Sequence, residues 1–289
     1  MIKLYSYAKI NLFLNVIDKL ENGYHLIDTV MQSIDLHDEI LVDTIKENTI
    51  VIETSDKSIP TDSKNTCYKA ASLIKEIYNI NSGVVIKLNK IIPSEAGLAG
   101  GSGNSAAVIK ALNELWDLNM SLDEMKEIGL KVGADVPFCI IGGTVRAEGI
   151  GEKLTKLNDF SWENILIVKP DFSLSTAFVY NNLRKEQYNL YNVSEMLNNI
   201  EQKNFNELAS LTTNTLERAV EEIHIEINEI KKVMMDNGAV SSMMTGSGSA
   251  LFGLYPNKES LEKAYNVLIN YYPKTYKTRT MDRGVDFIK

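Results

Sequence analysis

The residues with the clearest chemical potential form a glycine-rich segment, residues 93–103. Its glycines are Gly97, Gly100, Gly101 and Gly103. It follows a β-branched run at residues 84–88 and precedes a pattern that predicts a helix over residues 104–118. Glycine lets the backbone approach a ligand closely, and a helix start directs unpaired N–H groups and a positive dipole end at an anion. A flexible linker or a helix cap is the ordinary alternative, but linkers seldom lie between a strand and an alanine-rich helix. The segment therefore predicts a phosphate-binding loop.

Two better-known phosphate signatures fit this chain poorly. No Gly-Lys pair occurs, which excludes a Walker A loop. The spacing Gly101-x-Gly103-x-x-Ala106 matches a relaxed dinucleotide fingerprint, so an NAD(P)-dependent oxidoreductase is one alternative. The predicted strand, however, ends near Lys90, about ten residues before this match, and residues 121–130 read as helix where a second strand is needed. A nucleotide-binding module without catalytic activity is the other alternative.

Phosphoryl transfer also needs a group that deprotonates the acceptor hydroxyl and a cation that offsets developing charge. Lys9 and Asn11 share one face of a strand predicted over residues 3–16, and Asp135 lies between apolar residues shortly before Pro137. Asp135 could accept the hydroxyl proton while Lys9 stabilises negative charge. Taken singly, Lys9 also fits a surface lysine and Asp135 a helix cap, and spacing alone does not bring them together.

A second glycine-containing segment, residues 245–250, lies between strands predicted at 240–244 and 251–254. A tight hairpin turn explains it about as well as a functional role does. As a functional element it could close over a substrate or buttress the first glycine-rich loop.

The pattern along the 289 residues predicts an α+β protein in two parts, residues 1–155 and 156–289, with loss of periodicity at 149–160 marking the junction. Extended runs at 26–34, 40–45 and 50–54 follow the first strand. Helices are predicted over 65–78 and after Ser121, where Glu124 completes a capping box. A strand pair closes the chain.

Composition narrows the possible partners. The net charge of −8 argues against nucleic acid or an anionic membrane, so phosphate must be bound by local geometry. No signal peptide or membrane span is predicted, which favours a cytoplasmic protein. Cys67 and Cys139 read as buried free thiols, and the three histidines lack zinc-site spacing.

The chain resembles the GHMP kinase superfamily over essentially its whole length, because it contains three motifs of that superfamily in the same order. They are an N-terminal strand motif, a central Pro-x-x-x-Gly-Leu-x-Gly-Gly-Ser loop and a C-terminal Gly-x-Gly turn. The resemblance implies a mixed-sheet N-terminal domain, an α/β C-terminal domain and an active site in the cleft between them. It implies ATP and Mg²⁺, with Asp135 as general base, Lys9 as its partner and Ser102 as metal ligand. The implied ATP-binding residues are Asn65, Pro93, Ser94, Glu95, Ala96, Gly97, Leu98, Ala99, Gly100, Gly101, Ser102, Gly103 and Asn104.

Within the superfamily, Ala8-Lys9-Ile10-Asn11-Leu12 together with Gly23-Tyr24-His25 resembles the members that phosphorylate the 2-hydroxyl of a cytidine diphosphate-linked methylerythritol for isoprenoid synthesis. Tyr24 and Tyr180 are expected to sandwich the cytosine while His25 hydrogen-bonds its edge. The implied substrate residues are Asn11, Tyr24, His25, Thr176, Tyr180, Gly246, Ser247 and Gly248. A mevalonate- or homoserine-type kinase is the nearest alternative, although it has no obvious use for Tyr24 and His25.

Two positions depart from the superfamily pattern. Glu95 replaces a small residue and is expected to point away from the phosphates, and Gly103 replaces a serine, which leaves Ser102 as the expected metal ligand. We expect a monomer or a weak homodimer.

Overall fold

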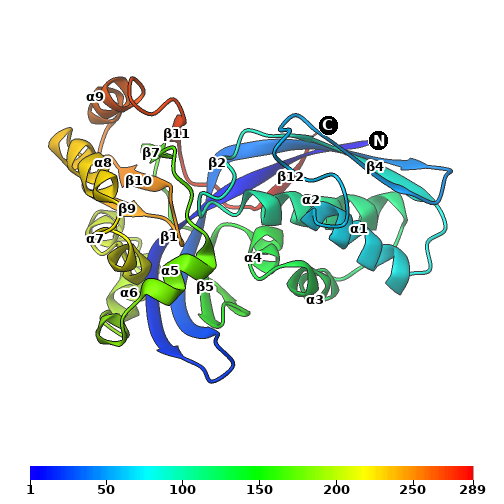
Figure 1. Cartoon of the computed structure of the whole chain (residues 1–289), viewed down its shortest axis with the longest axis horizontal. Helices are drawn as coiled ribbons and strands as arrows, with labels where there is room; N and C mark the ends of the chain where they lie inside the picture. The colour runs from blue at the N-terminus through cyan, green and yellow to red at the C-terminus, as the bar shows by residue number, and fades with distance from the viewer. Residues whose placement is uncertain (289) are drawn as a thin grey trace.

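The computed structural model describes residues 1–288 and contains two β-sheets (Figure 1). The strands of the larger sheet are β1 (Ile2–Lys19), β2 (His25–Ile45), β3 (Ile50–Thr54), β4 (Gly83–Asn89), β5 (Thr144–Gly149), β6 (Lys153–Lys156), β8 (Thr213–Asn214) and β12 (Val285–Ile288). Those of the smaller sheet are β7 (Ile165–Val168), β9 (Ser241–Met244), β10 (Leu251–Leu254) and β11 (Thr275–Thr278). The larger sheet is mixed, since β3–β4 and β1–β8 pair in parallel. The smaller sheet, in the order β11-β7-β10-β9, is antiparallel.

The helices divide between the two sheets (Figure 1). Near the larger sheet lie α1 (Thr66–Ile77), α2 (Gly100–Leu115), α3 (Leu122–Val132) and α4 (Val136–Ile141). Around the smaller sheet lie α5 (Thr176–Asn182), α6 (Ser194–Glu201), α7 (Phe205–Ser210), α8 (Ile225–Asp236) and α9 (Lys258–Leu268), with 3₁₀ turns at Lys185–Gln187 and Thr215–Ala219. The predicted α+β class is confirmed. No helix of the described chain combines the length and apolarity that crossing a membrane requires.

A long hairpin of β1 and β2 connects the two parts of the molecule (Figure 1). Along β1, Leu4 is buried with the helices of the larger sheet, whereas Ile10 and Val16 are buried in two further clusters that include the smaller sheet. The two extended runs predicted over 26–45 are one strand, because a register shift opposite Tyr7 and Ala8 absorbs the irregular residues between them. Because β1 is buried in the clusters of both parts, its side chains can contribute to a site formed by the two parts.

The chain end differs from the prediction. The last two strands do not pair with each other: β11 pairs with β7, and β12 returns to β1 in the larger sheet. The β5–β6 hairpin occupies much of the expected junction at 149–160 and also belongs to the larger sheet. The division at residue 155 stays a prediction. Ser121 and Glu124 form the predicted capping box of α3, and both cysteines are buried as predicted.

Candidate active site

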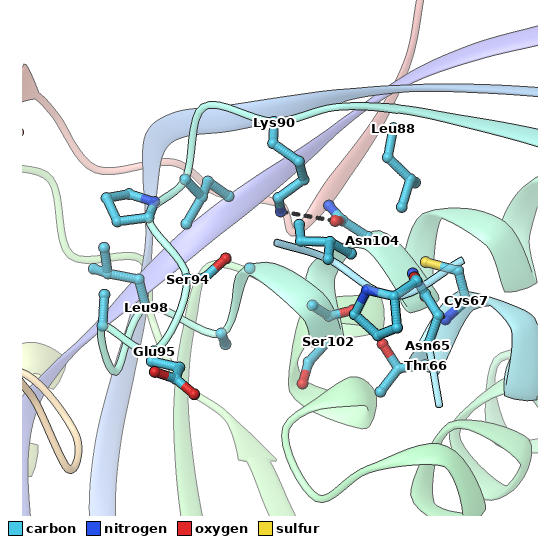
Figure 2. A pocket seen from close by; sticks show the side chains of 18 of the residues that line it. Asn65, Thr66, Cys67, Leu88, Lys90, Ser94, Glu95, Leu98, Ser102 and Asn104 are labelled. Carbon is cyan, nitrogen blue, oxygen red and sulfur yellow. Dashed lines mark hydrogen bonds between the residues drawn. The ribbon is translucent and has the colours of Figure 1, made fainter. Parts of the chain in front are cut away.

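The glycine-rich segment lines a first cavity of about 380 Å³ (Figure 2). Helix α2 begins at Gly100, four residues before the predicted start at Asn104, because Ala99 in the left-handed conformation (φ 57°) turns the chain directly into the helix. The N–H groups of Gly100, Gly101 and Ser102 thus form the unpaired first turn of α2 beside the cavity. A helix start without acidic first-turn residues favours an anion at this place.

Each residue predicted to bind ATP lines the first cavity except Gly103. A β-carbon at Gly103 would lie 3.2 Å from the carbonyl oxygen of Tyr7, so this glycine lets α2 pack closely on β1. Two other residues predicted to bind ATP already use their side-chain amides in hydrogen bonds within the protein. Asn65 caps α1 by accepting the N–H of Cys67 at 2.8 Å, and Asn104 is buried and hydrogen-bonded inside the protein.

A second cavity, of about 820 Å³, contains Lys9, Asp135 and every residue predicted to bind the acceptor. Four residues line both cavities, which therefore adjoin at this point: Glu95, Gly97, Ala99 and Ser102. Glu95, which is expected to point away from the phosphates, is thus one of the residues that line both cavities, and the direction of its carboxylate stays a prediction. Figure 2 shows Glu95 on the loop and Ser102 at the start of α2, both beside the first cavity.

Lys9 is buried and donates a hydrogen bond of 2.5 Å to Oδ1 of Asn11, as expected from their shared strand face. Asn11 in turn donates to the hydroxyl of Thr29 on β2 at 2.9 Å. Burial lowers the pKa of Lys9, and the nearby charge of Asp135 opposes that shift. Asp135 itself is half-buried at the start of α4, and its carboxylate makes no capping hydrogen bond. The fold thus brings into one cavity a lysine and a carboxylate that spacing alone could not join.

The two glycine-rich segments touch each other through their backbones. A β-carbon on Gly97 would lie 2.1 Å from the carbonyl oxygen of Thr245, and one on Gly246 would lie 3.0 Å from Nζ of Lys9. The N–H of Ala250 donates to the carbonyl of Ala96 at 3.2 Å. The segment at 245–250 is therefore both a hairpin connection between β9 and β10 and a buttress of the first loop.

Two side chains that the sequence did not single out hold this buttress. The amide of Asn214 donates to the carbonyls of Met244 at 2.7 Å and Gly246 at 2.8 Å. A buried carboxylate, Glu217, accepts the N–H of Met244 at 2.7 Å and pairs with Lys231. Asn214 reaches its position because β8 pairs with β1, a long-range contact that leaves no local sequence signal.

His25, which also lines the second cavity, contacts two tyrosines. Its ring lies 4.8 Å from that of Tyr180, tilted by 38°, and Nε2 is 3.3 Å from the hydroxyl of Tyr188. Burial, with Lys19 nearby, lowers the pKa of His25, which favours the neutral ring at pH 7. A neutral imidazole offers one donor and one acceptor, which suits the edge of a nucleobase. Tyr24 lines the same cavity and is exposed to solvent. Tyr188 is a further residue that sequence reasoning missed.

Comparison with known proteins defines the family. The model of the GHMP kinases N terminal domain matches residues 65–143, and that of the GHMP kinases C terminal region matches residues 196–274. The chain belongs to the GHMP kinase family. The N-terminal match includes the first glycine-rich loop and Asp135, and the C-terminal match includes the second glycine turn.

Relatives within the GHMP kinases are similar over nearly their whole length. The 4-diphosphocytidyl-2-C-methyl-D-erythritol kinase of Caldicellulosiruptor bescii is 47% identical over 91% of this chain and 92% of the relative. That of Clostridioides difficile is 42% identical over 99% and 97%, respectively. A crystal structure of 4-(cytidine 5'-diphospho)-2C-methyl-D-erythritol kinase superposes with a TM-score of 0.83 at 29% identity, covering 96% of this chain and 98% of the other. A homoserine kinase from Cytophaga hutchinsonii, at 22% identity and a TM-score of 0.79, shares the fold.

Proposed function

We propose that this GHMP kinase transfers the γ-phosphate of ATP to the 2-hydroxyl of 4-diphosphocytidyl-2-C-methyl-D-erythritol. The observation that carries the proposal is the junction of the two cavities, where a phosphate-binding helix start meets a cavity that holds Lys9, Asp135 and a base-reading histidine. Relatives of that name are 41–47% identical to this chain, which supports the same acceptor.

The reaction would take place where the cavities adjoin. The first turn of α2 holds the phosphates of ATP, with the γ-phosphate directed toward Gly97 and Ser102, which line both cavities. Asp135 accepts the proton of the acceptor hydroxyl, and its half-buried carboxylate is available because it does not cap α4. The ammonium of Lys9, fixed by Asn11, lies beside the second glycine turn and stabilises the charge that develops at the transferred phosphoryl group.

The residues at the junction fit a magnesium ion carried in with the nucleotide. In the described chain no cluster of three or more His, Cys, Asp or Glu side chains could hold a metal unaided. Mg²⁺ in kinases commonly takes one or two protein oxygens and completes its shell with phosphates and water. The hydroxyl of Ser102 and the carboxylate of Glu95 are the protein oxygens suited to this role, since both residues line both cavities. When bound, the ion neutralises phosphate charge.

The acceptor's cytosine would be recognised by the histidine and tyrosines that line the second cavity. His25 is neutral and ordered by Tyr188, so its ring can hydrogen-bond the base edge, while Tyr180 and Tyr24 supply aromatic faces for stacking. This combination distinguishes a cytidine-linked acceptor from mevalonate or homoserine, which lack an aromatic base. The preference for the cytidine substrate therefore depends on residues 24, 25 and 180.

The test is a comparison of acceptors. The protein is incubated with ATP and Mg²⁺ and with 4-diphosphocytidyl-2-C-methyl-D-erythritol, mevalonate or homoserine, and ADP release is followed. We expect turnover of the cytidine substrate and a kcat/KM for the other two alcohols that is lower by a factor of about 1,000 or more, because a site built to hydrogen-bond a polar group strongly rejects compounds that lack it. Turnover of mevalonate or homoserine without turnover of the cytidine substrate would refute the assigned acceptor.

A further inference from the structure

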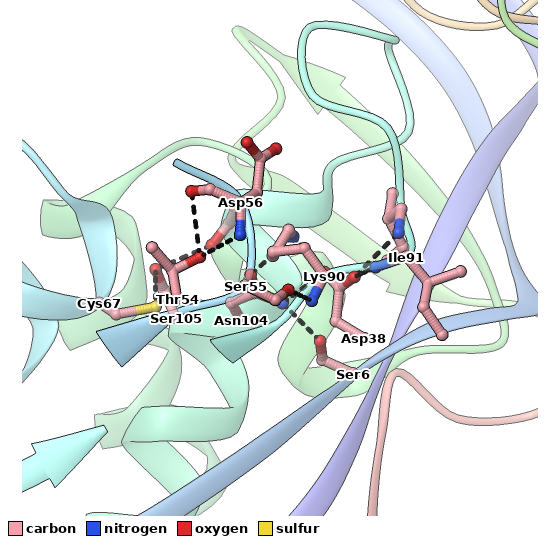
Figure 3. A network of polar contacts seen from close by, with 12 residues as sticks. Ser6, Asp38, Thr54, Ser55, Asp56, Cys67, Lys90, Ile91, Asn104 and Ser105 are labelled. Carbon is pink, nitrogen blue, oxygen red and sulfur yellow. Dashed lines mark hydrogen bonds and ion pairs between the residues drawn. The ribbon is translucent and has the colours of Figure 1, made fainter. Parts of the chain in front are cut away.

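A buried carboxylate outside both cavities joins the two ends of the nucleotide-binding loop. Asp38 on β2 is fully buried and accepts hydrogen bonds from four donors (Figure 3). Its Oδ1 accepts the N–H groups of Ile91 at 2.7 Å and Ile92 at 2.9 Å, where the chain leaves β4 and enters the loop. Its Oδ2 accepts the amide of Asn104 at 2.8 Å and the ammonium of Lys90.

These contacts hold the loop from both sides. Ile91 and Ile92 precede the glycine-rich segment, whereas Asn104 lies in the second turn of α2, just after it. Asn104 is further fixed by Nδ2 donating to the hydroxyl of Ser6 at 2.7 Å and by Oδ1 accepting from Lys90 at 2.8 Å. One carboxylate thus sets the distance between the loop entrance and the helix start that faces the phosphates.

The loop requires such support. Two of its non-glycine residues, Glu95 and Ala99, have positive φ values of 50° and 57°. Such conformations persist only where the surrounding structure fixes them. Lys90 also lines the first cavity, and its charge is compensated by Asp38, with which it forms an ion pair that is nearly inaccessible to solvent. Leaving one member of a buried pair uncompensated is costly, so the two side chains hold each other in place.

We propose that Asp38 is a positioning residue for nucleotide binding: it acts through Ile91, Ile92, Lys90 and Asn104 and does not touch the nucleotide. Asn104, predicted from the sequence to bind ATP, belongs to the same clamp. The inference rests on the proposed function, since it takes the first cavity as the ATP site. It concerns ATP specifically, because Asp38 contacts none of the acceptor residues.

The test variant is Asp38→Asn, which keeps the shape of the side chain but replaces one acceptor oxygen with a donor. We expect the dissociation constant of a non-hydrolysable ATP analogue, measured by titration calorimetry, to rise about 10- to 100-fold, because hydrogen bonds to a charged group are lost. The KM of the acceptor at saturating ATP should change less than about threefold. Ser6→Ala is a milder change outside both cavities and should raise the dissociation constant of the analogue a few-fold. It tests the proposed role of this cluster if Asp38→Asn does not fold.

Leu112→Ala is the matched control. Leu112 is buried on α2 about two turns beyond Asn104, and its truncation lowers stability without removing a polar contact. It should lower Tm and leave analogue binding unchanged. Analogue binding within twofold of the native value in the folded variants, or an equal rise in acceptor KM, would overturn the role of Asp38. If the native protein does not bind the analogue, the nucleotide site itself is misassigned, which is a distinguishable result.

Discussion

The contact between the two glycine-rich segments can be tested at Gly97. An alanine β-carbon there would lie 2.1 Å from the carbonyl oxygen of Thr245 and 3.1 Å from the nitrogen of Gly248, both backbone atoms. Because ordinary contacts lie near 3.4 Å or beyond, the loop and the turn must separate by more than about 1 Å. Gly97 also has a φ of +71°, which strains any other residue.

The expected loss of stability in Gly97→Ala has two contributions. The left-handed backbone costs alanine about 1–2 kcal/mol, and overpacking against a rigid neighbour adds about 1–3 kcal/mol. Gly97→Ala should thus lower the free energy of unfolding by about 2–5 kcal/mol. A displacement of about 1 Å between the phosphate loop and the turn beside Lys9 should also lower kcat/KM on the order of a hundredfold.

Gly23→Ala separates the two contributions. Gly23 has a similar φ of +87°, but its added β-carbon meets nothing within 4 Å. This control should lose about 1–2 kcal/mol and bind ATP as the native protein does. Urea unfolding gives the stabilities, calorimetry with an ATP analogue gives the affinities, and ADP release gives kcat/KM. If Gly97→Ala resembles Gly23→Ala in both the free energy of unfolding and the ATP affinity, the backbone contact between the two segments does not support the site.

Three further outcomes are expected. Asp135→Asn should lower kcat at least about a hundredfold and leave ATP affinity within twofold, measured by ADP release and calorimetry; normal turnover would place the base elsewhere. Because burial lowers the pKa of His25 from its ordinary value, the neutral ring is favoured at pH 7 and is lost only as the pH falls through that lowered pKa. The KM of the cytidine acceptor should therefore rise over that acidic range while the KM of ATP does not. This pH dependence should disappear in His25→Gln. If it persists in that variant, another titrating group causes it. Asn214→Ala should raise acceptor KM about tenfold by releasing the second glycine turn, and an unchanged KM would show that the turn holds its shape without Asn214.

The sequence predicted the features that depend on local pattern. The glycine content of the first loop, the capping box at Ser121 and the strand face shared by Lys9 and Asn11 are local, and the structure contains all three. The start of α2 was predicted too late, since glycine is a poor helix former and Gly100–Gly103 read as loop.

Features that depend on long-range pairing were not predictable. Asp38 reads as an ordinary charge in a strand until β2 and β4 pair and bring it to Ile91 and Ile92. Asn214 and Tyr188 likewise gain their roles from contacts with β1 and His25 that are distant in sequence. The meeting of Lys9 with Asp135 could be expected only from the family resemblance, because their 126-residue separation (135 − 9) carries no geometric information.

The phosphorylated position on the acceptor tests the central claim most directly. In 4-diphosphocytidyl-2-C-methyl-D-erythritol the carbon that bears the 2-hydroxyl also carries the methyl group, so it has no hydrogen. The product made from ATP and this acceptor should therefore show a new phosphate-monoester signal in the proton-coupled ³¹P spectrum that is not split by a carbinol proton. A split monoester signal would mean transfer to a different hydroxyl, and no new monoester signal would mean no transfer; either result would contradict the account.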